Sequence, residues 1–187
     1  MGNRTALIFA FVLLWAFTSS VEGQTTRVAS DKKVITKFES DAERIHVQRE
    51  TLRSRVPKIS VDATPAEIET NKRSLLEAMA LARKDAKMGE LFTSDAKKLI
   101  RKIIQTELKG WKRDELRKTV LQETRGVVLN VNSVYPPSRE LVEMSPSLLL
   151  ALPQLPRSMR YRFAGQYLAI LDRDTGIVID FMKNALA

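Results

Sequence analysis

The stretch that decides the fold is YRFAGQYLAILDRDTGIVIDF, residues 161–181. It contains three short runs rich in aromatic and β-branched residues, at 161–163, 167–171 and 177–181, and such runs are typical of strands. Gly165 and the segment 172–176 separate the runs and supply residues that favour turns. Three strands joined by tight turns predict an antiparallel β-meander.

Upstream of this stretch, apolar residues recur every three or four positions, which is the spacing of helices that bury one face. A first helical stripe is interrupted at Arg49 and consists of Ile35, Phe38, Ala42, Ile45, Leu52 and Val56. We expect it to pack on the body of the protein; the alternative is that it joins copies of the chain. Residues 64–67, TPAE, form a capping box and begin a second helix, which we expect to continue to Gly89.

Two further helices are expected before the chain turns to strands. Thr93 or Ser94 begins one, which we expect Gly110 to end, and the other covers about 112–123. The run VVLNV at 127–131 then predicts an additional strand. Helices followed by strands without regular alternation predict an α+β fold, with a helical N-terminal part packed on a small antiparallel C-terminal β-meander.

The N-terminus has the pattern of a secretory signal peptide. Residues 6–17 are continuously apolar and follow Arg4, and the small residues Val21 and Gly23 fit the positions before a cleavage site. We therefore expect a signal peptide over 1–23. A membrane-spanning helix needs about 20 apolar residues, so this run is short for one, although an uncleaved anchor remains the alternative.

The rest of the chain then divides into a charged amphipathic helical extension, 24–57, and a single α+β domain, 58–187. The sequence contains no Cys, which excludes disulfides and thiol catalysis. Export without disulfides favours a bacterial periplasm or the cell exterior. No second apolar run is long enough to span a bilayer, so we expect no membrane span after signal cleavage.

Positive charge is concentrated in one part of the sequence. The net charge is +9, and residues 97–125 hold ten Lys or Arg against four Asp or Glu. Five of these cations form the candidate binding site for an anionic partner: Lys97, Lys98, Arg101, Lys102 and Lys109. The partner would be an anionic envelope polymer, a lipid headgroup or another envelope protein. Nucleic acid is disfavoured because few aromatic residues lie between the lysines. The alternative is an ordinary solvated face.

Neither a metal nor a cofactor is expected. Glu43 and His46 have the spacing of a di-iron ligand pair, but the motif occurs once and the chain has a single His. We therefore expect a surface His beside an acid three residues away. Residues 172–176, DRDTG, begin like a calcium loop, but its twelfth position is Lys183 rather than Glu.

The sequence favours a non-enzymatic binding domain over an enzyme, since it lacks nucleophile elbows and phosphate-binding glycine loops. The alternative is a hydrolase that uses paired carboxylates near the meander. Its candidate acids are Asp172, Asp174, Asp180 and Glu140. The meander also holds four aromatic residues, which we expect to pack on the helices rather than form an exposed strip on an edge strand. These are Tyr161, Phe163, Tyr167 and Phe181.

Several motifs resemble the C-terminal tail of a family of uncharacterised exported bacterial proteins. They are LPQLP at 152–156, YRFAG at 161–165, LAILD at 168–172, IVIDF at 177–181 and AKMGELFT at 86–93. The resemblance covers about residues 75–187. It implies an exported α+β domain of unknown activity, and it provides no catalytic residues. We expect structural roles in the sheet and its turns for Asp180-Phe181 and Tyr161-Arg162.

Overall fold

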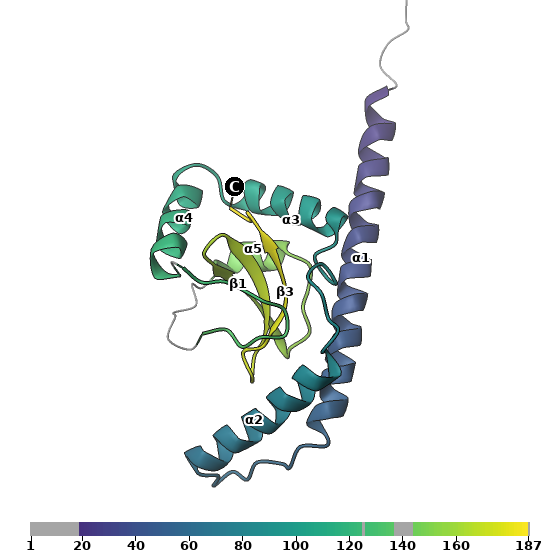
Figure 1. Ribbon diagram of the computed structural model, residues 1–187. Coiled ribbons are helices and arrows are strands. Elements are labelled where there is room, and N and C mark those ends of the chain that lie inside the picture. Colours follow the sequence, from purple (N-terminus) through teal and green to yellow (C-terminus); the bar gives the residue numbers. More distant parts are fainter. Residues whose placement is uncertain (1–18, 125, 137–143, 187) are drawn as a thin grey trace, which may run out of the picture.

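The computed structural model describes residues 19–124, 126–136 and 144–186. Five helices precede three strands in these ranges (Figure 1). The elements are α1 (Ser19–Arg53), α2 (Pro65–Ala82), α3 (Ser94–Glu107), α4 (Trp111–Glu123), α5 (Pro146–Ala151), β1 (Met159–Ala164), β2 (Tyr167–Asp172) and β3 (Val178–Lys183). The predicted α+β fold is confirmed.

The strands form one antiparallel sheet in the order β1-β2-β3, as the meander prediction required. Phe163 pairs with Leu168 across the first turn, and Ala169 pairs with Phe181 on the other side of β2. Gly165 in that turn has φ +57°, a backbone conformation that glycine adopts without a steric penalty. The turn predicted at Gly165 therefore joins β1 to β2, and the register of β2 against β3 shifts between Ile170 and Leu171.

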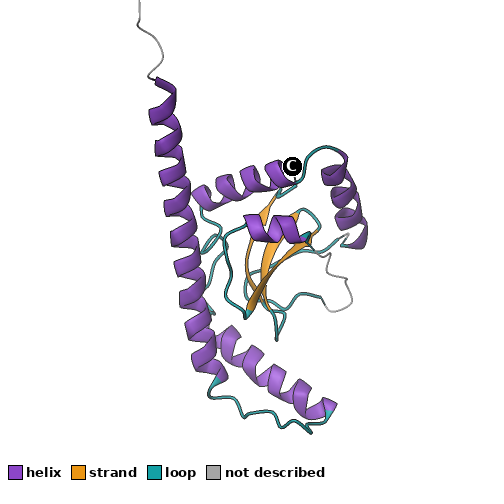
Figure 2. Ribbon diagram, turned by 180° about the vertical axis from the view of Figure 1, so that it is seen from behind, coloured by secondary structure: helices purple, strands orange, loops and turns teal. Residues whose placement is uncertain are grey.

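Both faces of the sheet are covered, so its strands are buried almost throughout. The main core joins one face to α1, α3 and α5, which lie around the sheet in Figures 1 and 2. A smaller cluster on the other face includes Val127, Leu129 and Tyr135 from the segment after α4. The four aromatic residues of the meander are all buried. Tyr161 and Phe163 pack with the helices as expected, whereas Tyr167 and Phe181 pack on the other face against the segment after α4. The edge-strip alternative is wrong.

The long helix α1 is part of the same core. Phe38, Ala42 and Ile45 are buried, and the Phe38 ring lies 5.9 Å from that of Phe92 and 6.5 Å from that of Tyr161. The expected packing of this stripe on the body is confirmed, and this chain's own core occupies its central positions. The N-terminal part of α1 projects past the body (Figure 1).

The predicted signal peptide falls largely outside the described residues. Helix α1 begins at Ser19 and passes through the Gly23–Gln24 bond, so cleavage there stays a prediction. Within the ranges that the structure describes, none of the helices combines the length and the apolar character that crossing a membrane requires.

The strand predicted at 127–131 is wrong. This segment is irregular. The chain pairs with the sheet just after it, where Asn132 and Ser133 exchange backbone hydrogen bonds with Val178 beside an isolated bridge between Val134 and Ile177. Val127 and Leu129 are buried on the second face of the sheet, while Val128 between them is exposed. The alternation of buried and exposed residues therefore reflects the burial of one side of the segment. The backbone of 127–131 lies over the sheet and does not pair with a strand.

Two predicted helix ends are also wrong. Helix α2 ends at Ala82 instead of Gly89, because the next residue, Arg83, turns its side chain inward and donates from Nη2 to the carbonyl of Ile179 at 3.1 Å. Gly89 belongs to the loop that follows. Helix α3 ends at Glu107, and Gly110 instead precedes α4 as its N-cap. The end of α2 therefore depends on a tertiary contact of Arg83, whereas Gly110 belongs to the start of the next helix. The local sequence pattern had assigned both glycines to helix ends.

Candidate functional site

The five predicted anion-binding residues belong to α3 and the turn after it. Thr93 begins α3, its hydroxyl accepting from the amide of Ala96 at 3.3 Å. The helix buries Ala96, Leu99, Ile100 and Ile104 against the core. Because residues three and four apart share a helical face, Lys98, Arg101 and Lys102 form one stripe on the side away from the core. We call this stripe the α3 basic face.

The contacts of these residues differ. The Lys98 and Lys102 side chains are 78% and 65% exposed. Lys98 Nζ lies 3.6 Å from Asp95 on its own helix, and Arg101 Nη2 donates to the carbonyl of Lys183 at 3.2 Å. Solvent-exposed ion pairs contribute little to stability, so the contact with Asp95 does not prevent Lys98 from binding another anion.

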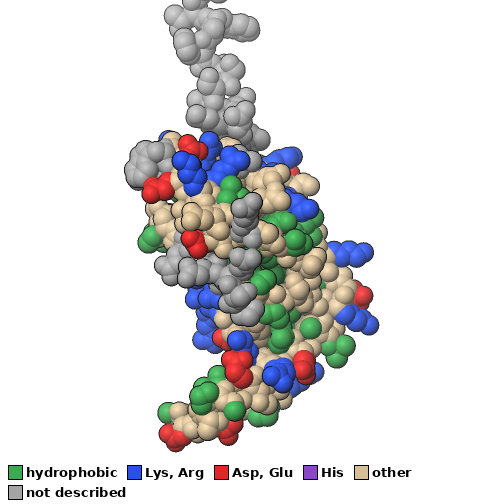
Figure 3. All heavy atoms as spheres, turned by 60° about the vertical axis from the view of Figure 1, so that its left-hand side comes forward, with side chains coloured by type: hydrophobic (Ala, Val, Ile, Leu, Met, Phe, Trp, Pro, Cys, Tyr) green, Lys and Arg blue, Asp and Glu red, His purple; other side chains and the backbone are tan. Residues whose placement is uncertain are grey.

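The structure separates the other two predicted residues from this stripe. Lys97 is half-buried at its margin, and Lys109 is exposed beyond the end of α3 at Glu107. The face instead continues onto α1 through Lys102, whose Nζ lies 2.8 Å from Asp31. Lys32 and Lys33, next to Asp31, are exposed. Figure 3 shows Lys and Arg side chains gathered at this end of the molecule, with a few acids among them.

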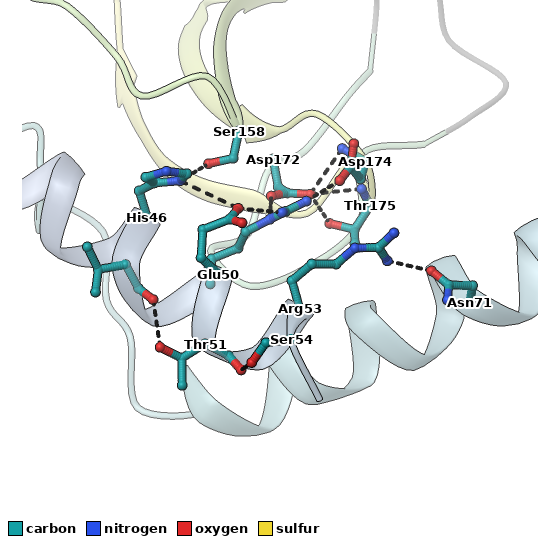
Figure 4. A network of polar contacts seen from close by, with 12 residues as sticks. His46, Glu50, Thr51, Arg53, Ser54, Asn71, Ser158, Asp172, Asp174 and Thr175 are labelled. Atoms are coloured by element: carbon teal, nitrogen blue, oxygen red, sulfur yellow. Dashed lines mark hydrogen bonds and ion pairs between the residues drawn. The ribbon is translucent and has the colours of Figure 1, made fainter. Parts of the chain in front are cut away.

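Two of the candidate acids meet at one arginine. Nε of Arg49 donates to Asp172 at 3.1 Å, Nη1 donates to Glu50 at 2.7 Å, and Nη2 donates to Asp174 (Figure 4). Burial acts to lower the pKa of Arg49, but the charge of Asp172 and the hydrogen bonds outweigh it and raise the pKa. Arg49 was visible in the sequence only as an interruption of an apolar stripe.

Asp172 also organises the turn between β2 and β3. Its Oδ1 accepts from the Thr175 amide and hydroxyl, both at 2.8 Å, and from the Asp174 amide at 3.1 Å. With Oδ2 bound to Arg49, both oxygens of this buried carboxylate have partners in the chain. These contacts give Asp172 and Asp174 structural roles. The hydrolase alternative stays a prediction that no observed contact favours, and Glu140 lies outside the described residues.

Asp180 is separate from this pair and binds a different segment. Its carboxylate accepts from the amides of Gly89, Leu91 and Phe92 at 2.8, 2.8 and 2.9 Å, and from its own neighbour Phe181 at 2.8 Å. Asp180 is fully buried, and Gly89 takes φ +98° to present its amide. A buried carboxylate thus holds the loop between α2 and α3 against β3. In the sequence the two partners lie in separate motifs, 86–93 and 177–181, and nothing there relates them.

His46 is not the surface residue that we expected. Its side chain is 14% exposed, and Nδ1 lies 2.7 Å from the hydroxyl of Ser158 and 3.8 Å from Glu50, instead of pairing with Glu43 (Figure 4). In a nucleophile–base–acid relay, the acid and the nucleophile take opposite ring nitrogens, whereas both partners here face the same one. Among the described residues, no group of three His, Cys, Asp or Glu could hold a metal ion.

Comparison with known proteins gives no further assignment. No family model, curated protein or solved structure matches the chain significantly. The proposed relation to exported bacterial proteins therefore stays an expectation from the motifs alone.

Proposed function

We propose that this chain is an exported protein of the bacterial envelope that acts as a non-enzymatic binding domain and docks its α3 basic face on an anionic partner. The observation that carries the proposal is the stripe of Lys98, Arg101 and Lys102 on the outer side of a helix whose inner side is anchored in the core. The rigid helix fixes the spacing of these residues, so that little backbone conformational entropy is lost when they bind an anionic surface.

The export pattern at the N-terminus supports an envelope partner. The α3 basic face lies at the end of the body from which α1 projects toward the N-terminus (Figure 1). The chain's own surface acids screen the stripe only in part, through Asp95 and Asp31. The partner that this arrangement fits best is a surface with closely spaced phosphates, such as anionic lipid headgroups.

Sedimentation with vesicles tests the proposal. The protein should bind vesicles that contain phosphatidylglycerol, should not bind pure phosphatidylcholine, and should be released as salt shortens the Debye length below about 8 Å. The triple charge reversal K98E/R101E/K102E should abolish this binding.

The matched control is K72E/K84E/K87E, which changes the net charge equally at exposed positions of α2 and the loop that follows it. Loss of binding in both triples would show attraction to the net charge alone and overturn a specific role of the α3 basic face. Retained binding in the α3 triple would also overturn it. A polyphosphate resin distinguishes a polymer partner from a lipid surface.

A further inference from the structure

A pocket of about 460 Å³ lies between the C-terminal half of α4, the turn that joins β1 to β2, and the C-terminal tail. This volume falls within the range of small-molecule sites, which is about 300–1,000 Å³. The pocket is distinct from the α3 basic face, because it contains none of the five predicted anion-binding residues. Four apolar side chains are part of its lining: Leu121, Val127, Val128 and Leu186.

The apolar wall is open on one side. Val128 is 71% exposed and Leu121 is 45% exposed, whereas Val127 and Leu186 are buried behind them. In Figure 3, where the α4 side of the molecule comes forward, hydrophobic side chains reach the surface of this face among Lys and Arg. A ligand with an apolar chain would cover Leu121 and Val128 and remove their surface from water.

Two polar side chains of the lining have no hydrogen-bond or ion-pair partner among residues 19–124, 126–136 and 144–186, which the structure describes. Arg117 on α4 is exposed at its rim and makes no ion pair or hydrogen bond with the residues that the structure describes. Tyr167 is 8% exposed and packs edge-on against Phe181 at 5.4 Å, and its hydroxyl has no hydrogen-bond partner in those residues. The described residues of the lining include no Asp or Glu. The pocket therefore combines the unpaired cation of Arg117 with an apolar wall, and Tyr167 belongs to the same lining.

We infer that this pocket binds a single-chain anionic amphiphile, with its carboxylate on Arg117 and the Tyr167 hydroxyl and its alkyl chain along Leu121 and Val128. Guanidinium and carboxylate match as a bidentate pair. A neutral amphiphile would leave Arg117 unpaired, and a small anion would leave the apolar wall in water. Both properties of the ligand are therefore required.

Calorimetric titration of the full chain with decanoate, below its micellar concentration, tests the inference. Decanol and acetate are the comparison ligands, since each lacks one of the two properties. We expect saturable binding of decanoate, binding of decanol at least about tenfold weaker, and no measurable binding of acetate. Equal binding of decanol, or no saturable binding of decanoate, overturns the inference.

Variants separate the two contributions. Arg117→Gln should weaken decanoate about tenfold and leave decanol unchanged, while Leu121→Asp should weaken both. The matched controls are Lys118→Gln, an exposed cation on α4 outside the pocket, and Leu150→Asp, an 80% exposed apolar position on α5. An effect of Lys118→Gln as large as that of Arg117→Gln would show non-specific attraction and overturn the site.

Two measurements guard against indirect effects. Arg117 and Leu121 are exposed enough that both variants should retain the thermal unfolding midpoint of the wild type. The α3 charge reversal K98E/R101E/K102E should leave decanoate affinity unchanged, because its residues do not line the pocket. The failure of one proposal is thereby distinguished from the failure of the other.

Discussion

Arg49 of α1 and Asp172 at the end of β2 form an ion pair inside the protein, with Nε of Arg49 3.1 Å from Oδ2 of Asp172 (Figure 4). The two side chains are 6% and 1% exposed and come from opposite ends of the sequence. Because water cannot hydrate either charge adequately at this site, each side chain requires the other. The pair therefore fixes where α1 lies against the sheet.

Removing one partner of this pair should be strongly destabilising. Arg49→Met leaves the buried Asp172 carboxylate without its counter-charge, and we expect the free energy of unfolding to fall by about 3–5 kcal/mol. Urea denaturation followed by circular dichroism measures it. The double variant R49M/D172N should lose less than the sum of the single losses. Lys37→Met, which breaks an exposed ion pair with Asp41, is the control and should cost less than about 1 kcal/mol.

Glu90 should make the fold sensitive to acid. It accepts from Nη2 of Arg44 at 2.9 Å and from Nη2 of Arg83 at 3.0 Å. Burial acts to raise the pKa of Glu90, but the two guanidiniums outweigh it and lower the pKa below the ordinary value of 4.5. Glu90 therefore binds a proton more tightly in the unfolded chain than in the folded protein. The stabilisation is complete above pH 4.5 and is lost as pH falls through the folded-state pKa.

Glu90→Gln removes this contribution. The stability difference between wild type and variant should be largest at neutral pH and should shrink below pH 4.5. Urea midpoints over a series of pH values measure this difference, with Glu69→Gln at an exposed position of α2 as the matched control. A difference that stays constant with pH would contradict the assigned role of the two guanidiniums.

Asp180 should hold the loop before α3 in place. In Asp180→Asn an amide group replaces one carboxylate oxygen, so that a donor faces the amides of Leu91 and Phe92 or of Gly89 and Phe181. We expect a loss of at least about 3 kcal/mol, because several charge-assisted hydrogen bonds are affected. Hydrogen exchange of the Gly89 and Leu91 amides should accelerate first. Asp95→Asn, exposed on α3, should leave both properties unchanged.

Phe38 tests whether α1 belongs to the core. It is 2% exposed and contacts the rings of Phe92 and Tyr161, so Phe38→Ala should cost about 3–5 kcal/mol. Val47→Ala, on the same helix at a 56% exposed position, should change stability by less than about 0.5 kcal/mol. Similar small losses in both variants would mean that α1 is an appendage that the sheet does not need.

The α+β class, the meander and its turns, and the helix starts at Thr64 and Thr93 were predictable from the sequence, because each depends on neighbours a few residues apart. The outer position of Lys98 and Lys102 was predictable for the same reason. The helix ends near Arg83 and Glu107 and the irregular segment 127–131 were not, since they depend on contacts with distant parts of the chain.

The sequence by itself determined the periodicity, the capping residues, the turn residues and the concentration of positive charge in residues 97–125. Only the tertiary structure decided that Arg49 binds Asp172 and Asp174, that Asp180 holds the Gly89 loop, and that Arg117 and Tyr167 share a pocket. The physical reason is sequence separation. Which buried charges and donors find one another depends on how helices and sheet pack, and packing brings together residues that no local pattern relates.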